Sequence, residues 1–307
     1  AQSGPRLFSA IPLRLCSWSR PAGWQLDVRF LIAERTNPVT SFLQKDTPLS
    51  HRPRKRFGQH FLRDPGVIDA IVRAIAPAET DTIVEIGPGP GAITRPLAAR
   101  AGHLHIIELD RDLAAALRDE FGGASNVTVH EADALRFDFS ALGTDLRVVG
   151  NLPYNISTPL LFHLLNFRDR IVDMHFMLQK EVVDRMAAAP GSKAYGRLGI
   201  MLGCYLHIEA LFDVPPEAFD PPPEVNSAVV RLDPLPPGTF QIDNEAALSA
   251  LVAKAFMQRR KTLRNALRDV VAAEDFDAVG IDPGLRPEQL PIADYVRLGN
   301  YLERNSR

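Results

Sequence analysis

The stretch Asn151-Leu152-Pro153-Tyr154 ends an apolar run in a way that packing does not require. It could recognise an exocyclic amino group of a nucleobase, a poor nucleophile because its lone pair is delocalised into the ring. The Asn151 side-chain oxygen and the Leu152 carbonyl would accept hydrogen bonds from its two N–H groups and free that lone pair. Pro153 would fix the turn and Tyr154 would stack on the base, so that orientation replaces a general base. The alternative interpretation is a strand that ends in a proline turn.

A glycine-rich loop follows the predicted strand at residues 82–86. Its pattern consists of Glu85, Gly87, Gly89 and Gly91. Glycine lets the backbone approach a ligand closely and reach positive φ. Dinucleotide enzymes use similar loops, so NAD is a rival ligand, but Pro88 and Pro90 fill the spacer positions and remove amides that a pyrophosphate needs. S-adenosylmethionine, which has an adenosine and no pyrophosphate, fits this loop better.

Two acidic residues end or follow the next predicted strands. Glu108 lies at the end of the strand near residues 103–109, and Asp133, followed by Ala134, lies at the end of the strand at 126–133. Because open α/β sheets bind ligands at the carboxyl ends of their strands, Glu108 could hold a ribose and Asp133 an adenine amino group. Each acid alone could equally be a solvated loop residue. Together with the glycine loop, they indicate an adenosine-containing cofactor.

Strand and helix patterns alternate from about residue 64 to residue 235. Asp64 and Pro65 have the types expected at a helix start. Apolar strands are expected at 82–86, 103–109, 126–133, 145–150, 171–179, 204–214 and 227–235. This order predicts an α/β fold with a mostly parallel sheet that is covered on both faces and has an antiparallel hairpin at the end.

Three segments are expected along the chain. Residues 1–50 show no persistent helical or strand period, and we expect an unstructured or non-native extension there, with an organelle transit peptide as the alternative. Residues 51–235 form the predicted α/β domain. After a proline-rich boundary, residues 236–307 form a small all-α domain, in which residues 244–271 are expected to be one helix and Pro287 to lie near the start of another.

Two clusters of cations could bind RNA. The clusters consist of Arg54, Lys55 and Arg56, and of Arg259, Arg260, Lys261 and Arg264. If residues 244–271 form one helix, Arg260, Arg264 and Arg268 share a face of it. A solvated charged helix is the plain alternative, but the run QRRK holds no acid, which favours a phosphate-binding face.

The overall composition limits the partners. A net charge of −2 over 307 residues argues against a protein that coats naked nucleic acid, and it suits a structured target such as a ribosomal particle. The two cysteines, Cys16 and Cys204, form no metal or disulfide motif, which indicates a reducing compartment. We therefore expect a cytoplasmic protein, a monomer, without a metal and without a membrane span.

Together, these motifs resemble those of the KsgA family, the dimethyladenosine transferases of small-subunit ribosomal RNA. The resemblance rests on RKRFGQHFL, EIGPGPGAIT, IELDRDL, EADAL, NLPYNISTP, MLQKEV, FDPPPEVNSAVV and FMQRRKTLRNAL, and it covers about residue 51 to the end. It implies that the cofactor contacts Gln59, His60, Leu62, Glu85, Gly87, Gly89, Gly91, Glu108, Asp133, Ala134 and Asn151. Within this set, Gly87 would line the methionine portion. Phe219 would sandwich the target base opposite Tyr154.

The resemblance implies that residues 51–235 form a Rossmann-like class I methyltransferase domain that uses S-adenosylmethionine, and that residues 236–307 form a helical domain that contacts rRNA. It also implies a reaction. An enzyme of this family dimethylates N6 of two adjacent adenosines in the 3'-terminal hairpin loop of small-subunit rRNA, within an immature particle, and contributes to small-subunit biogenesis. Three rival functions share some of these motifs: a large-subunit rRNA methyltransferase that confers antibiotic resistance, a DNA adenine methyltransferase, and a non-catalytic assembly or transcription factor.

Overall fold

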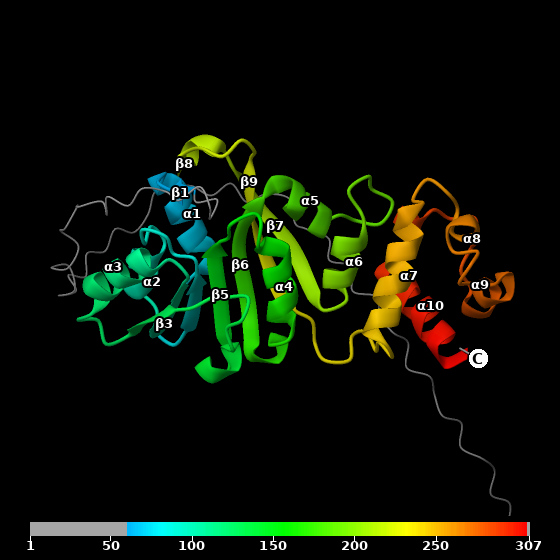
Figure 1. Ribbon diagram of the computed structural model, residues 1–307, viewed down its shortest axis with the longest axis horizontal. Coiled ribbons are helices and arrows are strands. Elements are labelled where there is room, and N and C mark those ends of the chain that lie inside the picture. The colour runs from blue at the N-terminus through cyan, green and yellow to red at the C-terminus, as the bar shows by residue number, and fades with distance from the viewer. Residues whose placement is uncertain (1–59, 306–307) are drawn as a thin grey trace, which may run out of the picture. The chain divides into compact units, whose positions relative to one another are not determined.

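A seven-stranded sheet forms the centre of the α/β part of the molecule. The computed structural model describes residues 60–305, and its sheet has the order β4-β3-β2-β5-β6-β9-β7 (Figure 1). The strands are β2 (Thr82–Ile86), β3 (His103–Glu108), β4 (Val127–Glu131), β5 (Leu146–Asn151), β6 (Ile171–Gln179), β7 (Leu206–Val214) and β9 (Ser227–Pro234). The first five in this order are parallel, and β9 is antiparallel to both β6 and β7. The predicted sheet, with its antiparallel end, is confirmed.

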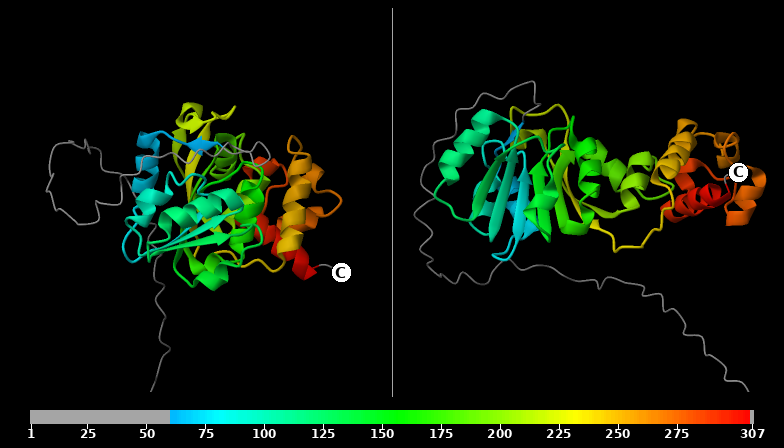
Figure 2. Two further views of the ribbon diagram at one scale, coloured as in Figure 1. Left: turned by 60° about the vertical axis from the view of Figure 1, so that its left-hand side comes forward. Right: turned by 60° about the horizontal axis from the view of Figure 1, so that its bottom comes forward.

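Apolar side chains alternate between the two faces of this sheet, because successive residues of a strand point to opposite sides. Val84, Val148 and Phe176 belong to the core under α4 (Ser157–Leu165) and α5 (Lys180–Met186). Their neighbours Ile83, Val149 and Met177 belong to the opposite core, which also contains side chains of α1 (Pro65–Ile75), α2 (Thr94–Ala98) and α3 (Arg111–Phe121). The two views in Figure 2 show helices on both sides of the strands. This burial on both faces explains the nearly continuous apolar strands in the sequence.

The first helix begins as its sequence predicts. Asp64 has an extended backbone, and its carboxylate accepts a hydrogen bond from the Val67 amide at 2.9 Å. Pro65 is the first helical residue, where its missing N–H has no partner to lose. The stripe of Ile71, Val72 and Ile75 is buried against the sheet. This start fixes the chain just after His60 and Leu62, two predicted site residues.

A third core joins the C-terminal helices. It contains side chains of α6 (Arg197–Gly203), α7 (Glu245–Met257), α8 (Leu263–Ala266), α9 (Ala273–Val279) and α10 (Ile292–Asn305). The short 3-10 helices are η3 (Phe139–Leu142), η4 (Arg168–Arg170), η5 (Pro216–Ala218) and η6 (Pro287–Gln289). Because α6 precedes residue 235, this core takes residues from both sides of the predicted domain boundary. The division at residues 235 and 236 stays a prediction.

The prediction of one helix over residues 244–271 is wrong. The helix α7 ends at Met257, Gln258 leaves helical geometry, and α8 starts after Thr262. The turn lets Leu263 and Leu267 bury their side chains in the same core as α7. In addition, the Leu263 amide donates to the Leu285 carbonyl at 2.7 Å, which a continuing helix would prevent. Arg260, Arg264 and Arg268 therefore do not share one helix face.

Several short elements were not predicted. They are the paired strands β1 (Phe61–Leu62) and β8 (Phe219–Asp220), and the helices α6 and α9. Pro287 lies in η6 rather than near the start of α10, which begins directly after Pro291. The predictions for residues 1–50, Arg54, Lys55, Arg56 and Gln59 fall outside the described residues. None of the described helices is long and apolar enough to cross a membrane.

Candidate active site

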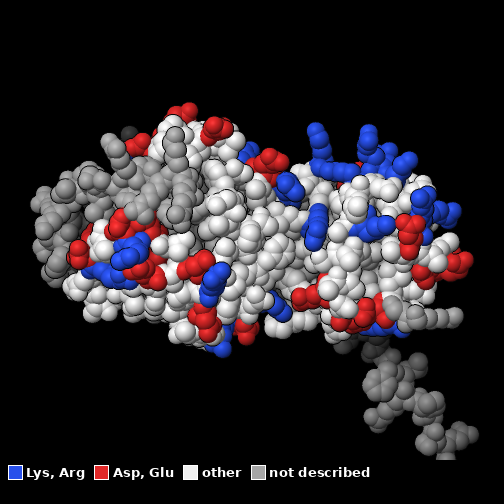
Figure 3. Space-filling view, viewed as in Figure 1, with Lys and Arg blue, Asp and Glu red and all other residues white. Residues whose placement is uncertain are grey.

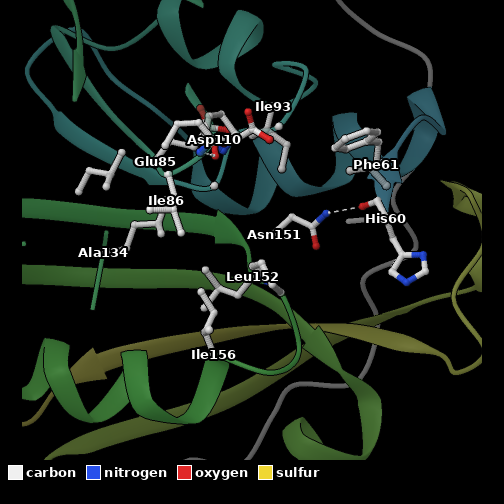
Figure 4. Close-up of a pocket in the computed structure, with 18 of the residues that line it drawn as sticks. His60, Phe61, Glu85, Ile86, Ile93, Asp110, Ala134, Asn151, Leu152 and Ile156 are labelled. Atoms are coloured by element: carbon white, nitrogen blue, oxygen red, sulfur yellow. Dashed lines mark hydrogen bonds between the residues drawn. The ribbon is translucent and has the colours of Figure 1, made fainter. Parts of the chain in front are cut away.

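One cavity opens at the carboxyl ends of β2, β3, β4 and β5, and it gathers most of the predicted site residues. Its lining includes His60, Leu62, Glu85, Gly87, Gly89, Glu108, Asp133, Ala134, Asn151, Leu152, Pro153, Tyr154 and Phe219. Figure 4 shows Glu85, Ala134, Asn151 and His60 around the same hollow, although they come from four separate parts of the chain. The parallel register brings these strand ends together, as the sequence pattern predicts.

The glycine loop has the backbone geometry that only glycine adopts easily. Gly87, Gly89 and Gly91 have φ values of 65°, 57° and 88°. A Cβ on Gly89 would lie 3.1 Å from the Phe61 ring, so the loop packs closely under β1. Gly91 does not line the cavity; its carbonyl accepts from the Arg95 side chain at 3.1 Å. The structure therefore places Gly91 behind the loop rather than at the ligand-facing surface.

Two buried carboxylates face the cavity at the loop. Glu85 is 2 % exposed, and its Oε2 atom has no hydrogen-bond partner. Burial raises the pKa of Glu85 to about 7. Burial also raises the pKa of Glu108, although the Asp110 amide donates to it at 2.8 Å. A site with a partnerless buried carboxyl oxygen fits a ligand that carries a cationic or N–H donor group.

The Asn151 side chain has a fixed orientation. Its Nδ2 donates to the His60 carbonyl at 3.2 Å, so its oxygen is turned away from β1 (Figure 4). Leu152 is buried in the core and its amide donates to the Met177 carbonyl at 3.2 Å, which ties the stretch to β6. Pro153 accepts from the Ile156 amide at 3.1 Å and closes a turn. The break in the strand therefore has a packing anchor, Leu152, in addition to its polar groups.

Tyr154 and Phe219 both line the cavity, but their environments differ. The Tyr154 hydroxyl lies 2.8 Å from the Ser227 hydroxyl, and its ring is stacked near His60, with centroids 6.2 Å apart. Phe219 is only 5 % exposed and pairs with Leu62 across the β1–β8 ribbon. The sandwich of a base between Tyr154 and Phe219 stays a prediction.

The second cation cluster lies apart from this cavity, since none of Arg259, Arg260, Lys261 and Arg264 lines it. Sequence reasoning also missed several lining residues. They include Phe61, Ile86, Ile93, Leu109, Asp110 and Ile156. The sequence did hold a signal for Leu109, an apolar residue directly after the strand-ending Glu108. In the structure its side chain is 52 % exposed.

At pH 8 we expect the Glu85→Gln variant to bind a cationic adenosine cofactor more weakly than the wild type does. The affinity of the variant itself should be almost the same at pH 6 and at pH 8. In the wild-type protein the carboxyl is largely neutral below its pKa of about 7, so affinity should rise between pH 6 and pH 8. The raised pKa of Glu85 destabilises the folded wild-type protein as pH rises from 4.5 toward 7. Without cofactor, the variant should therefore unfold at a higher temperature than the wild type at pH 8. Calorimetric titration and thermal unfolding measure both effects. Glu274→Gln, on the exposed start of α9, is the control, and a wild-type affinity independent of pH would contradict the prediction.

The strand order and the cavity at the strand ends are those of a class I methyltransferase. Residues 50–304 match the family described as Ribosomal RNA adenine dimethylase, and the chain belongs to this family. Ribosomal RNA small subunit methyltransferase A of Thiobacillus denitrificans is 60% identical over 252 residues, which cover 82% of this chain and 98% of that protein. The protein of the same name from Aromatoleum aromaticum is 57% identical over 256 residues, 83% of this chain and 96% of that protein.

Solved structures agree with this assignment. A dimethyladenosine transferase from Plasmodium falciparum has a TM-score of 0.69 and 26% identity, over 78% of this chain and 96% of that one. The 23S rRNA methyltransferase ErmE has a TM-score of 0.65 and 24% identity, over 79% of this chain and 99% of that one, and at this identity it shows the fold alone. The predicted family, fold and enzyme class are confirmed.

Proposed function

We propose that this enzyme transfers methyl groups to N6 of two adjacent adenosines in the 3'-terminal hairpin loop of small-subunit rRNA, twice each. The observation that carries the proposal is the fixed Asn151 amide, with its oxygen directed away from His60, at the edge of a cavity that also holds Glu85 and Glu108. The relatives at 55–60% identity, all named small subunit methyltransferases, support the small-subunit target.

S-adenosylmethionine is the cofactor that the cavity fits best. The partnerless Glu85 oxygen suits a cationic ligand, and the left-handed glycines leave room for close approach. Gly87 and Gly89 would line its methionine portion, Glu108 would hold the ribose, and Asp133 with Ala134 would hold the adenine, with His60 and Leu62 beside them. When bound, the cofactor supplies an electrophilic methyl group.

The protein's own groups prepare the amine. The Asn151 oxygen and the Leu152 carbonyl accept hydrogen bonds from the two N–H groups of the target amine. These contacts pull the nitrogen toward tetrahedral geometry, which frees its lone pair. Tyr154 stacks on the base, a contact worth about 1–3 kcal/mol, and Phe219 closes the opposite side. No general base is needed, because the nitrogen becomes acidic once it is alkylated and releases its proton to solvent.

The turn between α7 and α8 is the surface that we assign to RNA. Figure 3 shows Lys and Arg side chains gathered over the region where α7 ends and α8 begins. In the described part of the chain, Arg260, Lys261 and Arg264 are exposed and form no ion pair with a carboxylate. Arg259 is half-buried and donates to the Lys193 carbonyl at 3.0 Å, so it also holds the turn in place. A compact group of unpaired cations suits phosphates at one place on a folded particle.

We expect a variant with Arg260→Gln, Lys261→Gln and Arg264→Gln to bind small-subunit rRNA about 10- to 100-fold more weakly at moderate salt. The slope of log affinity against log salt should fall by roughly 2–3, one unit or slightly less for each lost phosphate contact. Cofactor affinity should not change. The control variant removes three ion-paired arginines instead, Arg73, Arg297 and Arg304, and an equal loss in both variants would contradict a specific phosphate-binding surface.

Methylation of small subunits that lack the modification tests the proposed function. We expect the wild-type monomer to incorporate four labelled methyl groups per immature particle, in the cytoplasmic setting predicted from the cysteine content. No incorporation would overturn the enzymatic proposal and favour an assembly factor. Transfer to large subunits only would favour the resistance methyltransferase.

A further inference from the structure

Ser227 places a buried hydroxyl at the start of a strand whose next residues are apolar. It opens β9, is fully buried, and pairs with Gln179 of β6 on one side and Val214 of β7 on the other. The three residues that follow it on β9 are Ala228, Val229 and Val230, all buried. Because a buried hydroxyl without a partner costs folding free energy, the partner that it contacts indicates its purpose.

That partner is the phenolic oxygen of Tyr154, at 2.8 Å. The same tyrosine is held at its backbone, where its carbonyl accepts a hydrogen bond from the Ser157 hydroxyl at 3.1 Å. The His60 ring lies nearly parallel to the Tyr154 ring, at 24°, and its Nδ1 donates to the Pro221 carbonyl at 2.8 Å. Tyr154 is thus restrained at its main chain and at the far end of its ring.

We propose that Ser227 is a positioning residue for the reaction, which holds the Tyr154 ring at the angle at which the target base stacks. The proposal rests on the function proposed above, in which Tyr154 forms one wall of the base pocket. Among the described residues, Ser227 is not part of the cavity lining, so it acts through Tyr154 and not on the substrate.

The geometry explains why a hydroxyl is needed at this position. A half-buried tyrosine beside an open cavity can move among its staggered rotamers. Strand pairing on both sides of Ser227 fixes the position of its Cα, so the hydrogen bond connects the ring to a strand that is paired on both edges. Alanine would preserve the strand and remove only this connection.

A double-mutant cycle with Ser227→Ala and Tyr154→Phe tests the proposal. Each single variant should lower kcat on undermodified small subunits by about 3- to 10-fold, the effect of one neutral hydrogen bond. The double variant should be no slower than the single variants, because both changes remove the same bond. The affinity for S-adenosylmethionine should stay within twofold of the wild type, and quenching of 2-aminopurine at the target position of a hairpin RNA should fall in all three variants.

Two further variants separate positioning from folding. Ser227→Thr keeps the hydroxyl in a strand that accepts β-branched residues, and its kcat should stay within about twofold of the wild-type value. Ser192→Ala removes another buried hydroxyl, one without a hydrogen-bond partner, and it should leave kcat unchanged. Multiplicative losses in the double variant, or a fully active Tyr154→Phe, would overturn the proposal. An inactive wild-type protein would instead overturn the proposed function, so the two failures are distinguishable.

Discussion

Replacing Asn151 with alanine is expected to lower the single-turnover rate of methyl transfer by roughly 10²–10³-fold, the size of effect seen when one preorganised polar contact to a reacting group is removed. The side-chain oxygen of Asn151 is one of only two acceptors assigned to the target amine. Without it, the lone pair stays delocalised and the amine is no longer held in line with the cofactor. The measurement is incorporation of labelled methyl groups with saturating cofactor and saturating small subunits.

The Asn151→Asp variant separates two roles of this side chain: its oxygen accepts from the target amine, and its Nδ2 group fixes its orientation. Aspartate keeps an oxygen but loses the Nδ2 donor, so a carboxylate would face the His60 carbonyl at the position of the present 3.2 Å hydrogen bond. We therefore expect this variant to be slow as well, although faster than alanine. Asn166→Ala, at the exposed end of α4, is the control for a lost amide. A near-normal rate for Asn151→Ala would mean that the amine is activated by other groups.

The parts of the site that are local in sequence could be predicted from it. Strand, glycine loop and acid follow each other within a few residues, as at Glu85 to Gly89, and their backbone demands are written in residue types. The same holds for the helix start at Asp64 and Pro65. Parallel register then places Glu85, Glu108 and Asn151 at one edge, and this step needs only the alternation of strands and helices.

Contacts between distant segments could not be predicted in this way. The β1–β8 ribbon pairs Phe61 with Asp220 and Leu62 with Phe219, two residues on each side, which is too short for any periodic signal. This ribbon nevertheless places the His60 ring beside Tyr154 and buries Phe219. The end of α7 is a similar case: residues 258–261 are good helix formers, and the turn is explained by contacts of Leu263 with the third core and with the distant Leu285 carbonyl.

The opposite end of the sheet holds the feature with the largest expected effect on stability. Arg147 is an isolated cation in the apolar strand β5, and its guanidinium contacts Asp173 at 2.8 Å and Asp81 at 2.7 Å. It also donates to the carbonyl of Ile75 at the end of α1, at 2.6 Å. Burial opposes the ionisation of Asp173, but its neighbours His175 and Arg147 outweigh burial and lower the pKa of this carboxyl.

We expect Arg147→Met to lower the free energy of unfolding by about 3–5 kcal/mol, because it leaves the buried Asp173 and the half-buried Asp81 without their cation. For a domain of this size, the thermal midpoint should fall on the order of 10 °C. In the wild type, the lowered pKa of Asp173 adds stability that is lost only as pH falls through that pKa. In the variant the unpaired carboxyl of Asp173 should have a raised pKa, so the loss of unfolding free energy should be smaller at pH 5 than at pH 8.

Arg73→Met, which breaks an exposed pair with Asp69 on α1, is the control and should change the free energy of unfolding by less than about 1 kcal/mol. A deficit for Arg147→Met that is no larger than this control, or that grows as pH falls, would show that the buried network does not hold α1 to the sheet.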